Sequence, residues 1–210
     1  MAIAEISHSY RQRARSLLAV NQAIHQIINV LQATNQWDNT AVLFTSDNGF
    51  YHGEHRIPQG KIRAYEEALR VPLVIRVPGM PGGRINRDLV VNVDLAPTIV
   101  ELAQVAPGHV MDGKSLVPLL EANANAPWRT AFLIESKGVS GFEGSNLKGV
   151  RSGQWKYLEH NSGERELYDM QNDPFERNSL HNSPAHQSVI QTLQQTLNTM
   201  KTCAGATCWQ

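Results

Sequence analysis

Hydrophobic residues recur at helical spacing near the start of the chain. Within residues 16–31 the apolar positions lie three or four apart, at Leu17, Leu18, Ala23, Ile24, Ile27, Ile28 and Leu31. This spacing predicts a long amphipathic helix with one buried face. The polar, turn-forming cluster at residues 35–40 ends the predicted helix.

Two short apolar runs follow, at residues 41–45 and 71–77. The first predicts a buried strand and the second predicts another strand. The stretch between them, residues 46–67, is polar and contains several glycines and histidines. The pattern over this region is therefore a strand, a long loop and a second strand.

The later part of the chain predicts two further helices, then several short strands. Asp94 is a suitable N-cap for a helix of about three turns, and a shorter helix is expected over residues 115–122. Short strand-like pieces at residues 130–134, 149–151, 155–158 and 166–168 predict a small antiparallel sheet. Apolar residues at helical spacing over residues 183–200 predict a closing helix that packs on this sheet.

The first predicted strand ends directly in Asp47, Asn48 and Gly49. In open α/β sheets the carboxyl ends of strands are where ligands bind. A carboxylate and an amide oxygen suit a hard cation such as calcium or magnesium. The alternative is a plain turn, because Asp-Asn-Gly is also a favourable turn sequence.

Charge and composition exclude several classes of function. The 19 basic residues balance the 19 acidic residues, and no block of like charge suggests a nucleic-acid partner. No apolar stretch approaches the ~20 residues of a membrane-spanning helix. The first ten residues also lack the basic start and apolar segment of a secretory signal.

A series of motifs, in order, resembles the C-terminal part of a sulfatase of the alkaline phosphatase superfamily, as in arylsulfatases and N-acetylglucosamine-6-sulfatases. The motifs lie at residues 45–49, 53–55, 60–61, 65–66, 70–73, 78–79, 94–98, 112–116, 153–157, 166–169 and 173–176. The resemblance implies an α/β fold. Residues 1–126 would form the C-terminal part of the alkaline-phosphatase-like sheet domain, flanked by helices. Residues 127–210 would form a small domain made of an antiparallel sheet and a helix.

The resemblance implies roles for individual residues. Asp47 and Asn48 fall where sulfatases hold a divalent cation, usually calcium, and Lys61 falls where a lysine contacts the substrate sulfate; without the motif, Lys61 reads as a solvated loop lysine. His52 and His55 are weaker candidates that could bind metal, orient ligands or transfer protons. Both could instead be loop residues that only form hydrogen bonds, and His55 looks more structural than catalytic.

The family's nucleophile, a formylglycine made from a Cys/Ser-x-Pro-x-Arg motif, is not encoded in this chain. The two cysteines, Cys203 and Cys208, are not followed by proline. A cysteine pair near the C-terminus recurs in glucosamine-6-sulfatase-like enzymes, which makes these two a disulfide candidate; free thiols and a metal site are the alternatives.

We therefore expect sulfate monoester hydrolysis in a complete enzyme and little or no turnover by this chain alone. A separate N-terminal chain could complete the site. The alternatives are a phosphatase or phosphonate hydrolase of the same superfamily, and a non-catalytic remnant or binding module for sulfated ligands. The compartment is left open, since many sulfatases of this family are exported or lysosomal.

Overall fold

The computed structural model describes residues 3–121, 127–139 and 142–209. The described residues form two compact units. The N-terminal unit comprises the chain up to Lys61 together with Tyr65–Met80, and the C-terminal unit comprises Ile62–Ala64 and the chain from Pro81 onward. The domain boundary predicted at residue 126 falls outside the described residues and stays a prediction.

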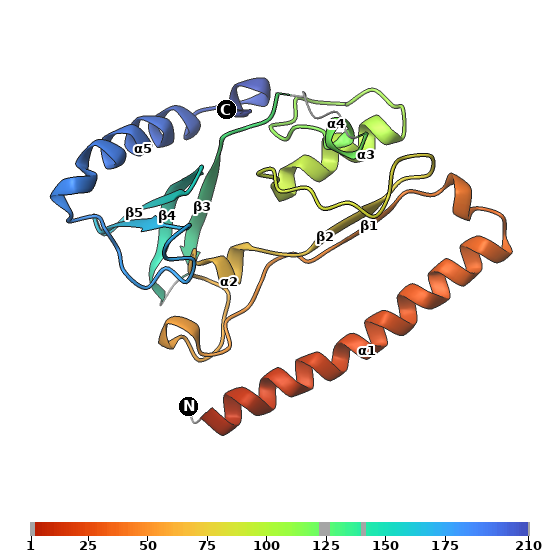
Figure 1. The fold of residues 1–210 in the computed structure, drawn as a ribbon, viewed down its shortest axis with the longest axis horizontal. Helices are drawn as coiled ribbons and strands as arrows, with labels where there is room; N and C mark the ends of the chain where they lie inside the picture. The colour runs from red at the N-terminus through yellow and green to blue at the C-terminus, as the bar shows by residue number, and fades with distance from the viewer. Residues whose placement is uncertain (1–2, 122–126, 140–141, 210) are drawn as a thin grey trace. The chain divides into compact units, whose positions relative to one another are not determined.

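The N-terminal unit contains one long helix and a two-stranded sheet (Figure 1). Helix α1 spans Ile3–Ala33, strand β1 spans Val42–Thr45 and strand β2 spans Leu73–Arg76. The strands pair antiparallel, with Val42 opposite Arg76 and Thr45 opposite Leu73. Short helices complete the unit: η1 (Trp37–Asn39), η2 (Glu54–Arg56) and α2 (Glu66–Leu69).

Helix α1 confirms the predicted helix but extends further toward the N-terminus, and the prediction of a buried face is wrong for the described residues. None of its 31 residues is buried, and Leu17, Val20 and Ile27 are exposed. The unit's only sheet has two strands, so the described residues supply no broad apolar layer to cover this face. Strand β1, predicted to be buried, is likewise only partly covered.

The C-terminal unit is built on a four-stranded antiparallel sheet in the order β3-β4-β5-β6. The strands span Ala131–Val139, Phe142–Ser152, Trp155–His160 and Arg165–Asp169. Helix α5, Gln187–Met200, packs on the sheet as predicted. The core between them contains Val150, Tyr157 and Leu167 from the sheet and Leu193 and Leu197 from the helix.

Before the sheet, this unit contains η3 (Asn92–Asp94), α3 (Leu95–Leu102) and α4 (Val117–Leu120), which agree with the predicted pair of helices. After the sheet come η4 (Pro184–His186) and η5 (Gly205–Cys208). A disulfide joins Cys203 to Cys208. None of the described helices is both long enough and apolar enough to cross a bilayer.

Candidate functional site

The loop after β1 lies tightly against the backbone of α2. The Gly49 amide donates a hydrogen bond to the Ala68 carbonyl oxygen at 2.8 Å. A Cβ atom at Gly49 would lie 1.9 Å from the Glu67 carbonyl oxygen, so only glycine fits without a backbone shift. The Asp-Asn-Gly sequence therefore anchors the loop in addition to turning the chain.

Lys61 brings the predicted site residues together. Its Nζ atom donates a hydrogen bond to Asn48 Oδ1 at 2.8 Å across 13 positions of sequence. The same nitrogen lies 3.5 Å from Asp47 Oδ2, with the Lys61 and Asp47 side chains 53% and 80% exposed. Solvent screens an ion pair this exposed, so it adds little to stability. The cluster is therefore accessible to ligands and contributes little to holding the fold.

Asp47 is held in its charged form. The backbone amide of Asn48 and the nearby Lys61 ammonium lower the pKa of this carboxyl below its usual 3.8. Asp47 and Asn48 thus present two oxygen atoms to one positive charge, the donor type that calcium prefers. As oxygen donors, these two side chains are of the type that suits such a cation. Calcium takes about six to eight oxygens, however, and no cluster of three or more His, Cys, Asp or Glu able to hold a metal occurs in the described part of the chain.

A buried tyrosine, which the sequence analysis missed, fixes the position of the Lys61 loop. The Tyr51 amide donates to the Gly60 carbonyl oxygen at 2.8 Å, and the Tyr51 hydroxyl accepts a hydrogen bond from the Tyr65 amide at 3.2 Å. Tyr51 is completely buried. The aromatic residues within this largely polar loop were the available signal that the loop has its own core.

His55 is held by packing. Its imidazole stacks on Tyr65, with ring centroids 3.8 Å apart, and its Nε2 atom lies 3.5 Å from Glu67 Oε2. Its φ of +52° is unusual for a residue other than glycine, so the surrounding contacts must hold this conformation. These contacts favour a structural role, which the sequence analysis had preferred for His55.

His52 lies between the loop and α1. Its ring contacts those of Tyr10 and Phe50, with centroids 5.3 and 5.2 Å apart. Its Nδ1 atom is buried and has no hydrogen-bond partner among the described residues. A buried polar atom without a partner is unusual in a folded protein.

Comparisons with known proteins identify related sequences and structures. Residues 53–203 match the family described as N-sulphoglucosamine sulphohydrolase, C-terminal. The chain is 35% identical over 143 residues to the human N-acetylglucosamine-6-sulfatase, covering 68% of this chain and 25% of the relative. The structure of BT4656 in complex with its substrate D-glucosamine-2-N,6-O-disulfate is also similar, with 34% identity and a TM-score of 0.79 over 88% of this chain and 39% of that one.

A phosphonate monoester hydrolase from Agrobacterium radiobacter is similar as well, with 27% identity and a TM-score of 0.76 over 87% of this chain and 39% of that one. The chain thus spans between about a quarter and two fifths of the length of these relatives. The matching family model covers more than half of this chain. The chain belongs to the sulfatase family, whose C-terminal portion it matches.

Proposed function

We propose that this chain takes part in the hydrolysis of sulfate monoesters, with Asp47 and Asn48 holding a divalent cation and Lys61 contacting the sulfate. The observation that carries the proposal is the convergence of Asp47 and Asn48 with the Lys61 ammonium. Sulfate ester hydrolysis builds negative charge on the oxygens around sulfur, and a fixed ammonium stabilises that charge. A bound calcium ion would supply Lewis-acid stabilisation at the same oxygens.

The nucleophile must come from outside this sequence, since both cysteines lack the family motif and are joined in a disulfide. We therefore expect the purified chain to hydrolyse an aryl sulfate at background rate. The exposed face of α1, which includes Leu17, Val20 and Ile27, is the proposed contact surface for the N-terminal portion of a sulfatase. That portion could belong to a longer form of the same polypeptide or be a separate chain.

Calcium titration by calorimetry tests the cation site directly. With few protein ligands, we expect an affinity in the millimolar range. Asp47→Asn should abolish the binding heat, whereas the matched change at an exposed aspartate, Asp88→Asn, should leave it unchanged. Absence of calcium binding by the wild-type chain would favour a non-catalytic remnant.

Addition of an N-terminal sulfatase fragment that carries the Cys/Ser-x-Pro-x-Arg motif tests the contact surface. We expect a one-to-one complex in sedimentation, lost when Leu17 and Ile27 are both replaced by glutamate. Loss of the complex in a Gln22→Glu control would instead indicate a general effect of charge on α1.

Phosphonate monoester hydrolysis is a second candidate function, favoured by the similarity to the Agrobacterium enzyme. The two functions share a cation and an anion-contacting group, so the chemistry of this chain does not separate them. The complex of this chain with the N-terminal sulfatase fragment can be assayed on both ester types. If the first proposal is correct, it should hydrolyse p-nitrophenyl sulfate faster than a phenyl phosphonate monoester.

A further inference from the structure

The loop between β1 and β2 contains an aromatic cluster made of Tyr51, His55 and Tyr65. The His55 imidazole is stacked on Tyr65, with 3.8 Å between the ring centroids and 9° between the planes. Tyr51 meets both rings edge to face, at 6.5 Å from His55 and 6.4 Å from Tyr65. The His55 side chain is 14% exposed. Stacked and edge-to-face pairs favour defined ring orientations, so the cluster gives this loop a fixed centre.

Tyr51 connects the aromatic cluster to the backbone beside Lys61. Tyr51 and Gly60 face each other in an antiparallel bridge, in which the Tyr51 amide donates to the Gly60 carbonyl oxygen at 2.8 Å. Gly60 directly precedes Lys61, whose ammonium donates to Asn48 Oδ1 at 2.8 Å. The position of Tyr51 in the cluster therefore determines where this ammonium can reach.

Helix α2 carries the contacts that hold Gly49, the residue after Asn48. The helix begins directly after its N-cap, Tyr65. The Ala68 carbonyl oxygen of this helix accepts a hydrogen bond from the Gly49 amide at 2.8 Å, and the Glu67 carbonyl oxygen leaves no room for a Cβ atom at Gly49. A shift of α2 would therefore move Gly49, and the Asn48 side chain with it.

His55 contacts α2 at two points. One is the stack on Tyr65, and the other is the Glu67 carboxylate, whose Oε2 atom lies 3.5 Å from His55 Nε2. This oxygen is buried and accepts no hydrogen bond from the described residues. Because a buried polar atom without a partner is costly, the imidazole nitrogen, which can carry a proton, is a stabilising neighbour for it. Together the two contacts hold the N-cap and the first turn of α2.

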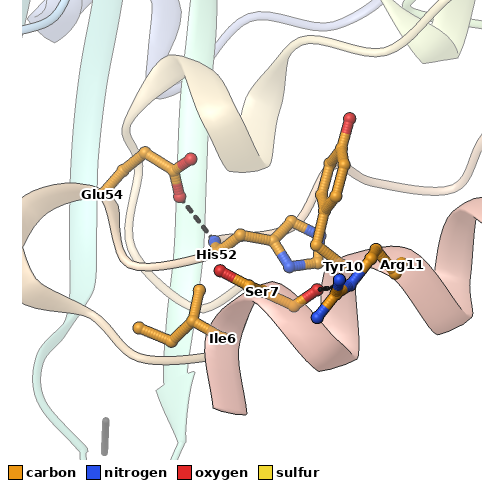
Figure 2. A pocket seen from close by; sticks show the side chains of 6 residues that line it. All are labelled: Ile6, Ser7, Tyr10, Arg11, His52 and Glu54. Atoms are coloured by element: carbon orange, nitrogen blue, oxygen red, sulfur yellow. Dashed lines mark hydrogen bonds between the residues drawn. The ribbon is translucent and has the colours of Figure 1, made fainter. Parts of the chain in front are cut away.

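The backbone holds His55 in a conformation that most residues avoid. His55 and Arg56 have φ values of +52° and +59°, in the left-handed region that costs free energy for residues other than glycine. Hydrogen bonds close the turn around them. The Glu54 carboxylate accepts one from the His52 amide (Figure 2), and the Ile57 amide donates to the Glu54 carbonyl oxygen at 2.8 Å. Strain that the surroundings maintain in this way is typical of functional sites.

We infer that His55 is a positioning residue that keeps the Asn48 oxygen and the Lys61 ammonium together. It acts through Tyr65 and Glu67, and in this role it contacts neither the cation nor the sulfate. The inference rests on the proposed function, because it assumes that the two positioned groups bind those ions. Substitution of His55 should then weaken the binding of both ions even where the chain stays folded.

Calorimetry with calcium chloride and, separately, with sodium sulfate tests this role. His55→Phe keeps an aromatic ring to stack on Tyr65 but removes the contact with Glu67. We expect about fivefold weaker binding of each ion, because small displacements of binding groups have large effects. Lys61→Met, which removes a binding group directly, should instead raise calcium affinity and lower sulfate affinity. A joint loss therefore distinguishes positioning from direct contact, and unchanged affinities in His55→Phe would overturn the inference.

A double-mutant cycle separates positioning from independent packing effects. Glu67→Ala should also weaken both ions about fivefold, and its combination with His55→Phe should again give about fivefold, not about 25-fold, because both changes remove the same contact. Glu67→Gln keeps an acceptor oxygen for His55 Nε2 and should cost less than about twofold. Additive losses from the two single changes, or equal losses in Glu67→Ala and Glu67→Gln, contradict the inference. The second comparison decides the matter if His55→Phe does not fold.

Trp37→Ala is the control for a general loss of stability. The Arg76 guanidinium lies over the Trp37 ring at 3.8 Å from its centroid, a contact between η1 and β2. Its removal should lower the urea midpoint and leave both ion affinities unchanged, provided that circular dichroism shows a folded chain. A loss of affinity as large as that of His55→Phe would mean that instability alone weakens binding, and the inference would fail.

Hydrogen exchange of the Gly49 amide tests the positioning without any ion. His55→Phe should speed this exchange about fivefold relative to the Gln36 amide, because a general loss of stability would speed both. The Gln36 amide donates to the Leu31 carbonyl oxygen at 2.8 Å in the same unit. Equal changes at both amides overturn the inference and leave the proposed function standing. Failure of the wild-type chain to bind either ion, with Gly49 exchange still dependent on His55, overturns the proposed function and supports the coupling of His55 to the loop.

Discussion

The Arg129 guanidinium donates hydrogen bonds to both carboxylate oxygens of Asp94 inside the C-terminal unit. Arg129 Nη2 donates to Asp94 Oδ1 at 2.6 Å, and Nη1 donates to Oδ2. The two side chains are 2% and 0% exposed. Asp94 also accepts hydrogen bonds from the amides of Val91 and Lys114. This pair therefore joins the start of α3, the loop before α4 and the segment leading into β3.

Removal of one partner from this buried pair should strongly destabilise the unit. Arg129→Met leaves the Asp94 charge buried without its guanidinium, and such losses lower the free energy of unfolding by about 3–5 kcal/mol. Urea unfolding followed by circular dichroism measures the change. The control is Lys148→Met, which removes the exposed pair between Lys148 and Glu135 and should change the free energy by less than about 1 kcal/mol. Equal effects of the two variants would contradict the prediction.

The same aspartate illustrates how much of the fold the sequence could predict. Its position at the start of α3 was predicted from local pattern, because capping residues and helical spacing act over a few positions. In the structure, Asp94 makes no side-chain capping bond to the helix; it pairs with Arg129, 35 positions away. A contact that distant depends on how the elements pack, and spacing along the chain carries no information about it.

The candidate site likewise has features that the sequence could predict and features that it could not. The convergence of Asp47, Asn48 and Lys61 could be expected only from the family motifs, since a lysine 13 positions along a polar loop is ordinarily solvated. The exposure of α1 could not be expected from its periodic pattern. That pattern identifies an apolar face but does not say which layer covers it.

Glu166 and His160 should give the C-terminal unit a measurable dependence on pH. Burial alone would raise the pKa of the Glu166 carboxyl, but hydrogen bonds with His160 and Tyr168 outweigh burial and lower the pKa below 4.5. His160 Nε2 lies 2.6 Å from Glu166 Oε1. Because the folded state lowers this pKa, the stabilisation is fully present above pH 4.5 and is lost as the pH falls through the lowered value.

Glu166→Gln should therefore reduce the free energy of unfolding at pH 7 by about 1 kcal/mol. The difference from wild type should shrink as the pH falls below 4.5. Urea titrations at several pH values measure it. Glu164→Gln, at an exposed neighbouring position, should behave like wild type at each pH, and a difference that grows in acid would refute the assignment.

Lys61 should affect cation and anion binding in opposite directions. Its ammonium donates a hydrogen bond to Asn48 Oδ1, which engages that oxygen, and it lies near Asp47. Lys61→Met frees this oxygen and removes a repulsive charge, so calcium affinity should rise a few-fold, equivalent to about 1 kcal/mol or less. Sulfate affinity should fall. Calorimetry with each ion measures both effects, and Lys137→Met, at an exposed lysine of β3, should change neither.

Gly49 should be indispensable to the geometry of the cation site. A Cβ atom there would lie 1.9 Å from the Glu67 carbonyl oxygen, a backbone atom that cannot rotate away as a side chain could. Gly49→Ala must therefore shift the loop, at a cost of about 1–3 kcal/mol in stability, and move Asp47 and Asn48 with it. We expect about tenfold weaker calcium binding by calorimetry, because small displacements of ligating groups have large effects. Gly82→Ala, where no atom lies within 4 Å, should leave calcium binding unchanged and stability within about 1 kcal/mol of wild type. Calcium binding by the Gly49→Ala variant at wild-type affinity would mean that the Asp47 and Asn48 oxygens do not form the cation site.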